Sequence, residues 1–100
     1  MDDIKLLELA AKAAGYQVEW VKNSGCFYRC EEEIGREQWD PLGDDGDALR
    51  LACRMAHKYG MSFAIRVAAF LHEEPEQEGD ECAATRRAIV RAAAEIGRAM

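Results

Sequence analysis

The chain has 100 residues, 49% of them hydrophobic and 32% charged, and its formal net charge at pH 7 is −6. A chain of this length has apolar surface for one hydrophobic core, so we expect a single domain over residues 1–100. The composition excludes a disordered chain, no apolar run approaches the ~20 residues of a membrane span, and the negative charge argues against direct nucleic-acid binding.

The N-terminal part of the chain predicts one helix followed by a β-hairpin. Apolar residues recur at helical spacing behind two aspartates that can cap a helix, so we expect a helix near 2–14 that ends at Gly15. The period then changes to two, which predicts strands at 16–21 and 26–31 joined by turn-forming residues. The segment 31–40 is polar and has no clear period, so we expect no regular element there.

The C-terminal part predicts two helices with a strand between them. Helical spacing predicts one helix near 44–59, ended by Gly60, and another near 80–98. Between them, the segment 61–71 fits either a strand, by the alternation of its first half, or a helix, by the alanines and leucine of its second half. Gly60 in front of it and its β-branched residues favour a strand within 61–69. The order α-β-β-α-β-α defines an α+β fold in which three helices cover a small antiparallel sheet. The residues expected to be buried are Leu7, Val18, Trp20, Leu49, Ala52, Phe63, Ile65, Ile89 and Ile96.

An acidic cluster precedes the second predicted helix. Asp44, Asp45 and Asp47 surround Gly46, a mixture that also occurs in calcium-binding loops. A calcium loop of that kind needs ligands at alternate positions and a closing glutamate, which this stretch lacks. A helix start explains the aspartates better, because they can accept the free N–H groups of the first turn and favour the positive end of the helix dipole.

Cysteine and histidine are the residues that could form a metal site or a catalytic site. Cys53 and His57 lie four residues apart, so one helix face could present both to zinc. Cys26 and Cys30 share a strand face but would be about 13 Å apart, too far for one ion unless the backbone bends. No phosphate loop, dinucleotide fingerprint or HExxH motif is present. We therefore expect reduced thiols packed as small hydrophobic groups, no bound metal or cofactor, and no enzymatic activity.

Acidic residues gather in two stretches, at 31–33 and at 73–81. Carboxylates spaced along a loop can imitate a row of phosphates and bind the Lys/Arg groove of a nucleic-acid-handling complex. They also keep a small protein soluble, which is the simpler explanation. The candidate partner-binding residues are Glu73, Glu74, Glu76, Glu78, Asp80 and Glu81.

Basic residues form two rows on predicted helices. Such rows are usually solvated helix faces, and the alternative is a local positive patch that binds a phosphate or an acidic surface, with an aromatic side chain for stacking. The candidate anion-binding residues are Arg50, Arg54, Arg86, Arg87 and Arg91. The aromatic candidates are Trp20, Trp39 and Tyr28.

Three segments of the chain resemble one known protein family. They read IKLLELAAKAAGYQVEW near the N-terminus, WDPLGDDGDALRLA in the middle and ECAATRRAIVRAAAEIG near the C-terminus. In this order they resemble the phage ABA sandwich domain family of small phage and prophage proteins. The resemblance implies a phage origin, helices packed on a sheet and no established enzymatic activity, and the family has no agreed site residues to carry over. It also implies that the turn and cap in 39–47 are a structural signature that positions the following helix.

A small acidic protein without recognisable catalytic residues is expected to act by binding. The N-terminus has no signal peptide, so we expect the cytoplasm of the bacterial host. The favoured hypothesis is a phage accessory protein that binds a host or phage macromolecule through its acidic stretch. One specific version inhibits a bacterial defence complex of the CRISPR type. The alternatives are a protein that sequesters a small anionic ligand, such as a phosphorylated signal nucleotide, and a structural phage protein.

Overall fold

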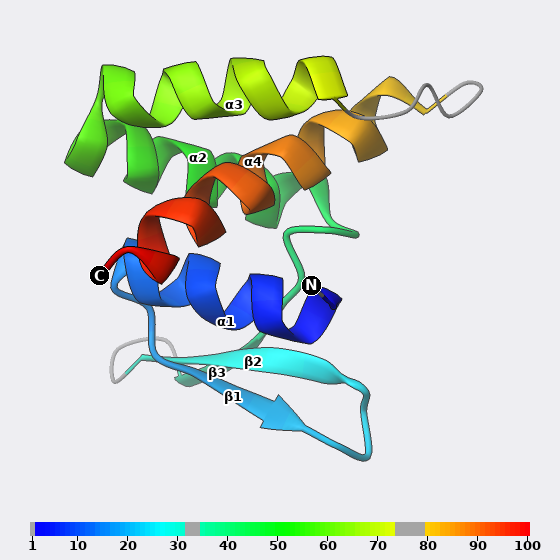
Figure 1. Cartoon of the computed structure of the whole chain (residues 1–100). Coiled ribbons are helices and arrows are strands. Elements are labelled where there is room, and N and C mark those ends of the chain that lie inside the picture. Colours follow the sequence, from blue (N-terminus) through cyan, green and yellow to red (C-terminus); the bar gives the residue numbers. More distant parts are fainter. Residues whose placement is uncertain (1, 32–34, 74–79) are drawn as a thin grey trace.

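The computed structural model describes residues 2–31, 35–73 and 80–100, and it places a three-stranded sheet on one side of a stack of helices (Figure 1). In chain order the elements are α1 (Asp3–Ala14), β1 (Val18–Val21), β2 (Cys26–Glu31), β3 (Gly35–Trp39), α2 (Asp45–Tyr59), α3 (Met61–Glu73) and α4 (Glu81–Arg98). Helix α1 lies over the sheet, α4 packs on α1, and α3 is the layer farthest from the sheet. The predicted α+β fold with a small antiparallel sheet is confirmed.

The sheet is antiparallel in the order β1-β2-β3, and one of its faces carries aromatic residues toward α1. Trp20 on β1 lies opposite Phe27 on β2, which lies opposite Trp39 on β3. The rings of Trp20 and Phe27 meet edge to face with 5.0 Å between their centroids. Phe27 and Trp39 are each only 2% exposed. The predicted hairpin is confirmed, and its inner face forms one wall of the core.

Strand β3 shows that the prediction of no regular element at 31–40 is wrong. Gly35–Trp39 pairs along β2, from Glu31 opposite Gly35 to Phe27 opposite Trp39. Only Trp39 of this strand is buried, because its other side chains face solvent. The strand therefore lacks an apolar alternation, and its conformation depends on the hydrogen bonds to β2, which no local pattern reveals.

Helix α3 shows that the prediction of a strand within 61–69 is wrong. Phe63, Val67 and Phe70 recur at positions i, i+4 and i+7, and they pack on the core. Phe63 and Val67 fit both the helical and the strand period, so tertiary packing decides between helix and strand. In the helix Ile65 points away from the core and is 62% exposed, where the strand prediction had buried it.

The predicted core contains a second error on α2. Leu49 is 65% exposed, because α2 turns Leu51 and Met55 toward the interior, both at 0% exposure. The remaining predicted core residues are buried or partly buried. The buried ones are Leu7, Phe63 and Ile96, and the partly buried ones are Val18, Trp20, Ala52 and Ile89.

Helices α1 and α4 pack closely through small residues. Ala10, Ala13 and Ala93 are completely buried between them and their neighbours. Gly97 on α4 lies against the backbone of α1: a Cβ atom added there would collide with the carbonyl oxygen of Leu9 and lie 2.8 Å from its carbonyl carbon. The close approach of the two helix backbones therefore requires glycine at this position.

The segment between β3 and α2 forms a hydrogen-bonded turn. Asp44 is the N-cap of α2, and its carboxylate accepts the backbone N–H of Asp47 at 2.8 Å. The carboxylate of Asp47 accepts the backbone N–H of Asp40 at 2.9 Å. The predicted helix cap is therefore confirmed, and these two carboxylates bind backbone groups of the turn and the first helical turn.

Candidate anion-binding groove

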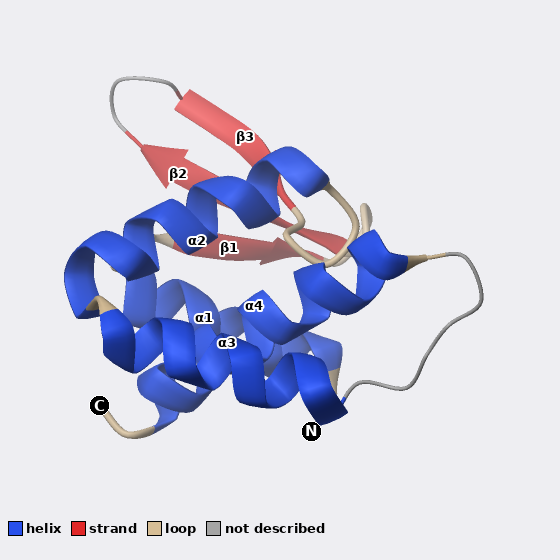
Figure 2. Ribbon diagram, turned by 90° about the horizontal axis from the view of Figure 1, so that it is seen from above, coloured by secondary structure: helices blue, strands red, loops and turns tan. Residues whose placement is uncertain are grey.

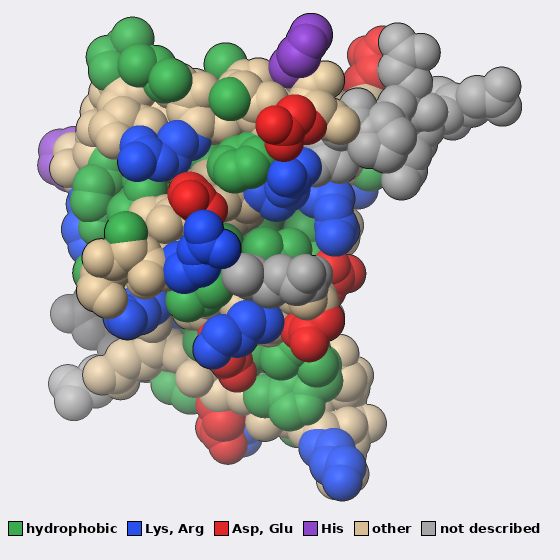
Figure 3. Space-filling model, in the orientation of Figure 1, with side chains coloured by type: hydrophobic (Ala, Val, Ile, Leu, Met, Phe, Trp, Pro, Cys, Tyr) green, Lys and Arg blue, Asp and Glu red, His purple; other side chains and the backbone are tan. Residues whose placement is uncertain are grey.

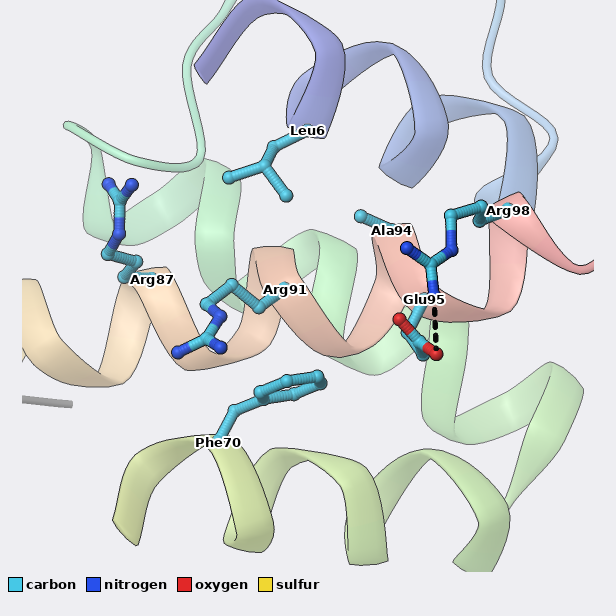
Figure 4. Close-up of a pocket in the computed structure, with 7 residues that line it drawn as sticks. All are labelled: Leu6, Phe70, Arg87, Arg91, Ala94, Glu95 and Arg98. Atoms are coloured by element: carbon cyan, nitrogen blue, oxygen red, sulfur yellow. Dashed lines mark hydrogen bonds and ion pairs between the residues drawn. The ribbon is translucent and has the colours of Figure 1, made fainter. Parts of the chain in front are cut away.

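A groove of about 310 Å³ opens between α3 and α4, beside α1 (Figure 4). Its arginines all come from α4, its aromatic ring comes from α3, and a leucine comes from α1. The residues that line it are Leu6, Phe70, Arg87, Arg91, Ala94, Glu95 and Arg98. Three guanidinium groups thus border a floor that is otherwise largely apolar.

Arg91 is the central and most enclosed arginine of the groove. Its guanidinium carbon lies 4.3 Å from the centre of the Phe70 ring, and its side chain is 30% exposed. Its Nη2 donates to a carboxylate oxygen of Glu73 at 3.2 Å. The aromatic face and the carboxylate together orient the guanidinium along the groove, which limits the entropy it would lose on binding a ligand.

The two outer arginines are also paired with carboxylates. Arg87 Nη2 donates to Asp3 at 2.9 Å, and Arg98 Nη2 donates to Glu95 at 3.3 Å. Asp3 and Glu95 are 59% and 42% exposed. Exposed pairs of this kind stabilise a protein by about 0–1 kcal/mol, so an incoming dianion can replace these carboxylates at little cost.

The spacing of the three arginines gives the groove its shape. Arg87, Arg91 and Arg98 stand at i, i+4 and i+11 on one helix, which places them on one side of α4. With a rise of 1.5 Å per residue, the row extends over about 16 Å along the helix axis. A row of this length exceeds one phosphate group, so it suits a ligand with more than one anionic group.

The groove does not contain all the arginines proposed from the sequence. Arg87 and Arg91 lie in it, and Arg98 is a third member that the sequence interpretation missed. Its signal was present, because seven residues after Arg91 is two helical turns on the same face. Arg50 lies outside on α2 and is paired with Asp47 at 2.7 Å, a hydrogen bond that raises the pKa of the arginine.

Arg54 and Arg86 hold other parts of the fold together. Arg54 Nε donates to the carbonyl oxygen of Ala14 at 3.0 Å, at the C-terminal end of α1, where a positive charge is favourable. Arg86 Nε donates to the carbonyl oxygen of Leu42 at 2.8 Å, and its Nη1 lies 2.6 Å from Asp45. The hydrogen bond to Asp45 raises the pKa of Arg86. Arg86 therefore links α4 to the turn before α2.

The aromatic residues proposed for stacking lie on the sheet and not in the groove. Trp39 is buried, Trp20 packs on Phe27, and the Tyr28 ring carries the guanidinium of Arg36 at 5.2 Å. Phe70 of α3 is the ring that the groove uses. The sequence interpretation missed Phe70, because it placed a strand within 61–69 and assigned no function to the residues that follow.

Three of the acidic residues proposed for partner binding, Glu73, Asp80 and Glu81, lie where α3 ends and α4 begins. Glu73 pairs with Arg91, and the carboxylate of Asp80 caps α4 by accepting the N–H of Ala83 at 2.8 Å. Glu81 is exposed in the first turn of α4. The other members of this stretch, Glu74, Glu76 and Glu78, lie outside the described residues, as do Glu32 and Glu33 of the first stretch.

The cysteines are free thiols on three different elements. Cys26 and Cys30 are partly buried on β2, whereas Cys53 on α2 and Cys82 on α4 are exposed. In the part of the chain that the structure describes, no three Cys, His, Asp or Glu side chains gather as ligands for a metal ion. Likewise, no described helix combines the length and hydropathy that crossing a membrane requires.

The side chains that line the groove suit recognition. Guanidinium groups bind phosphate and carboxylate through two parallel hydrogen bonds, and Phe70 and Leu6 contribute the apolar part of the lining. Comparison of the chain with protein-family models, curated proteins and solved structures finds no match.

Proposed function

We propose that this protein binds a small phosphorylated ligand in the groove between α3 and α4, and that it acts by sequestering that ligand. The observation that carries the proposal is that Arg87, Arg91 and Arg98 line one groove, in which the Arg91 guanidinium carbon lies 4.3 Å from the centre of the Phe70 ring. The length of the row favours a ligand with at least two anionic groups, and the flat guanidinium of Arg91, which lies over Phe70, favours a flat base. These features together support a nucleotide-type ligand.

The resemblance of three segments to the phage ABA sandwich domain family supports a biological setting for this activity. We propose that the protein is a phage accessory protein that acts in the cytoplasm of a bacterial host. A phage protein that holds a phosphorylated signal nucleotide would lower its free concentration and so prevent it from activating a host enzyme. This role needs tight binding and no chemical step.

Equilibrium binding decides the proposal. Purified protein is titrated with inorganic phosphate, nucleoside mono-, di- and triphosphates and cyclic dinucleotides, and the heat of binding is measured. Arg91→Gln should weaken binding of the best ligand about 10- to 100-fold, because hydrogen bonds to a charged group contribute about 1.5–3 kcal/mol. Binding should also weaken as the salt concentration rises.

The sheet offers a matched control for Arg91. Arg36 also pairs with a glutamate at 3.2 Å and also lies over an aromatic ring, at 5.2 Å from the Tyr28 centre. Arg36→Gln should therefore leave ligand binding unchanged. Equal losses in Arg36→Gln and Arg91→Gln, or no binding of any of these ligands at about millimolar concentration, would refute the groove as the site.

A second candidate function is binding to a macromolecular partner, of which an inhibitor of a CRISPR-type defence complex is one version. The observation in its favour is that α3 ends and α4 begins at the same end of the molecule (Figure 1), with exposed Glu73 and Glu81 as the two ends of the acidic stretch. Capture from host lysate by the protein and by a variant with Gln at 73, 74, 76 and 78 tests it. Unchanged association of the variant would reject phosphate mimicry.

A further inference from the structure

The outward side of α3 is apolar and exposed to solvent. Met61 and Ile65 are 72% and 62% exposed, and Ala68 and His72 continue the same row at i+7 and i+11 from Met61. Helix α3 is the outermost layer of the fold, as the view from above shows (Figure 2). Hydrophobic side chains are visible at the surface over this helix (Figure 3). We call Met61, Ile65, Ala68 and His72 the outer row.

The outer row differs from the solvent faces of the other helices. A surface helix usually has one apolar side for the core and one polar side for water. Helix α1 follows this rule, with exposed Lys5, Glu8 and Lys12. Helix α3 does not, because Phe63, Val67 and Phe70 already face the core while the opposite side is also apolar. An exposed apolar side of this kind indicates a contact surface.

The charge of the outer row indicates which kind of partner covers it. The chain has a net charge of −6, yet the outer row contains no Asp, Glu, Lys or Arg. The charged residues of α3 lie on one flank: Arg66 donates to Ser62, and Glu73 pairs with Arg91. A basic or acidic partner gains nothing at this row, whereas a second copy of the chain can approach it without like charges meeting at the contact.

The spacing of the outer row also allows two copies of the row to pair with each other. In an antiparallel pair of α3 helices related by a two-fold axis, residues whose numbers add up to 133 face each other, since the axis passes between Arg66 and Val67. Met61 then faces His72 of the second copy, and Ile65 faces Ala68 of the second copy. A large side chain meets a smaller one at the centre, which lets the helices approach closely.

We propose that this protein forms a homodimer through an antiparallel pairing of α3 with α3 of a second copy, centred on Ile65 and Ala68. A row of this length buries an area at or below the lower end of stable interfaces, which bury about 1,200–2,000 Å² in total. The dimer is therefore weak and concentration-dependent. The groove borders α3 at Phe70, which packs toward the core on the side opposite to the outer row, so the dimer leaves the groove open.

Sedimentation velocity over a concentration series up to about 1 mM tests the dimer. The wild-type chain should show a reversible monomer–dimer equilibrium. Ile65→Lys and Ala68→Glu should each lower the association constant about tenfold or more, because each places a charge against an apolar residue of the other copy. Leu49→Lys is the matched control, because Leu49 is 65% exposed on α2 and lies outside the outer row, and it should leave the equilibrium unchanged.

A mixture of the two charged variants tests the register. In a mixed dimer of Ile65→Lys with Ala68→Glu, the introduced lysine of one copy faces the introduced glutamate of the other, and the second central contact is wild type. The mixture should therefore associate more strongly than either variant alone, and added salt should weaken this gain. A monomeric wild type at about 1 mM overturns the proposal, as does an equal loss in Leu49→Lys or a mixture that stays monomeric.

Discussion

Replacement of Gly97 by alanine is the most direct test of how α1 and α4 are packed. In an exposed helix this change stabilises a protein by up to ~1 kcal/mol, because alanine has the higher helix propensity. Here the added methyl group would collide with the carbonyl oxygen of Leu9 and lie 2.8 Å from its carbonyl carbon. Both contacts are with backbone, so relief requires the two helices to move apart and to open the alanine-rich interface between them.

The expected change is a net loss of stability. Overpacking of a core costs about 1–3 kcal/mol, and a collision with backbone belongs at the upper end of this range. After subtraction of the gain in propensity, we expect Gly97→Ala to lower the free energy of unfolding by about 2 kcal/mol. For a domain of this size the midpoint of thermal unfolding should fall by roughly 8–16 °C.

Gly46 provides the control, measured by the same thermal and urea unfolding experiments. It also lies in a helix, and a Cβ atom there would contact only the ends of the Asp44 and Arg50 side chains, at 3.2 and 3.4 Å. The Arg50 side chain can move, and the Asp44 carboxylate needs to shift by only a few tenths of an ångström, which keeps its capping hydrogen bond, so Gly46→Ala should leave stability unchanged or raise it by up to ~1 kcal/mol. A Gly97→Ala protein that is as stable as Gly46→Ala would show that α1 and α4 are not in close backbone contact.

Three further predictions concern the stability that comes from Arg86, from helix α3 and from the N-cap of α2. Arg86→Gln should lower stability by about 1–2 kcal/mol in urea unfolding because it releases the turn before α2, whereas Arg87→Gln should change stability by less than about 0.5 kcal/mol. The hydrogen bond to Asp45 raises the pKa of Arg86, so the charge of Arg86 and its contribution to stability are fully present at neutral pH. They are lost only as the pH rises through that raised pKa. The loss of stability in Arg86→Gln should therefore be equal at about pH 6 and pH 8. Phe63→Ala should cost about 3–5 kcal/mol and Ile65→Ala less than about 1, and equal costs measured by thermal unfolding would contradict the helical assignment of α3. Asp44→Ala should cost about 1 kcal/mol through loss of the N-cap, and an unchanged urea midpoint would count against the cap.

The sequence by itself determined the elements whose signals are local. Aspartates at 2, 44 and 80 accept backbone N–H groups at the start of α1, α2 and α4, as the capping pattern predicts. Gly15 and Gly60 end α1 and α2 with positive φ angles of 79° and 58°, which glycine adopts without strain. The hairpin of β1 and β2 follows from alternation and turn residues. Each of these signals involves a few neighbouring residues, so no knowledge of the rest of the fold is needed.

Only the tertiary structure decided which apolar residues are buried and which charged residues meet. Gly35–Trp39 is a strand because β2 offers hydrogen bonds to it, and 61–73 is a helix because Phe63, Val67 and Phe70 pack on the core. The groove arises because α3 brings Phe70 beside an arginine row on α4, from a part of the chain that the sequence had assigned to a strand and a loop. These outcomes depend on contacts between residues far apart in the chain, and the pattern of neighbouring residues contains no information about such contacts.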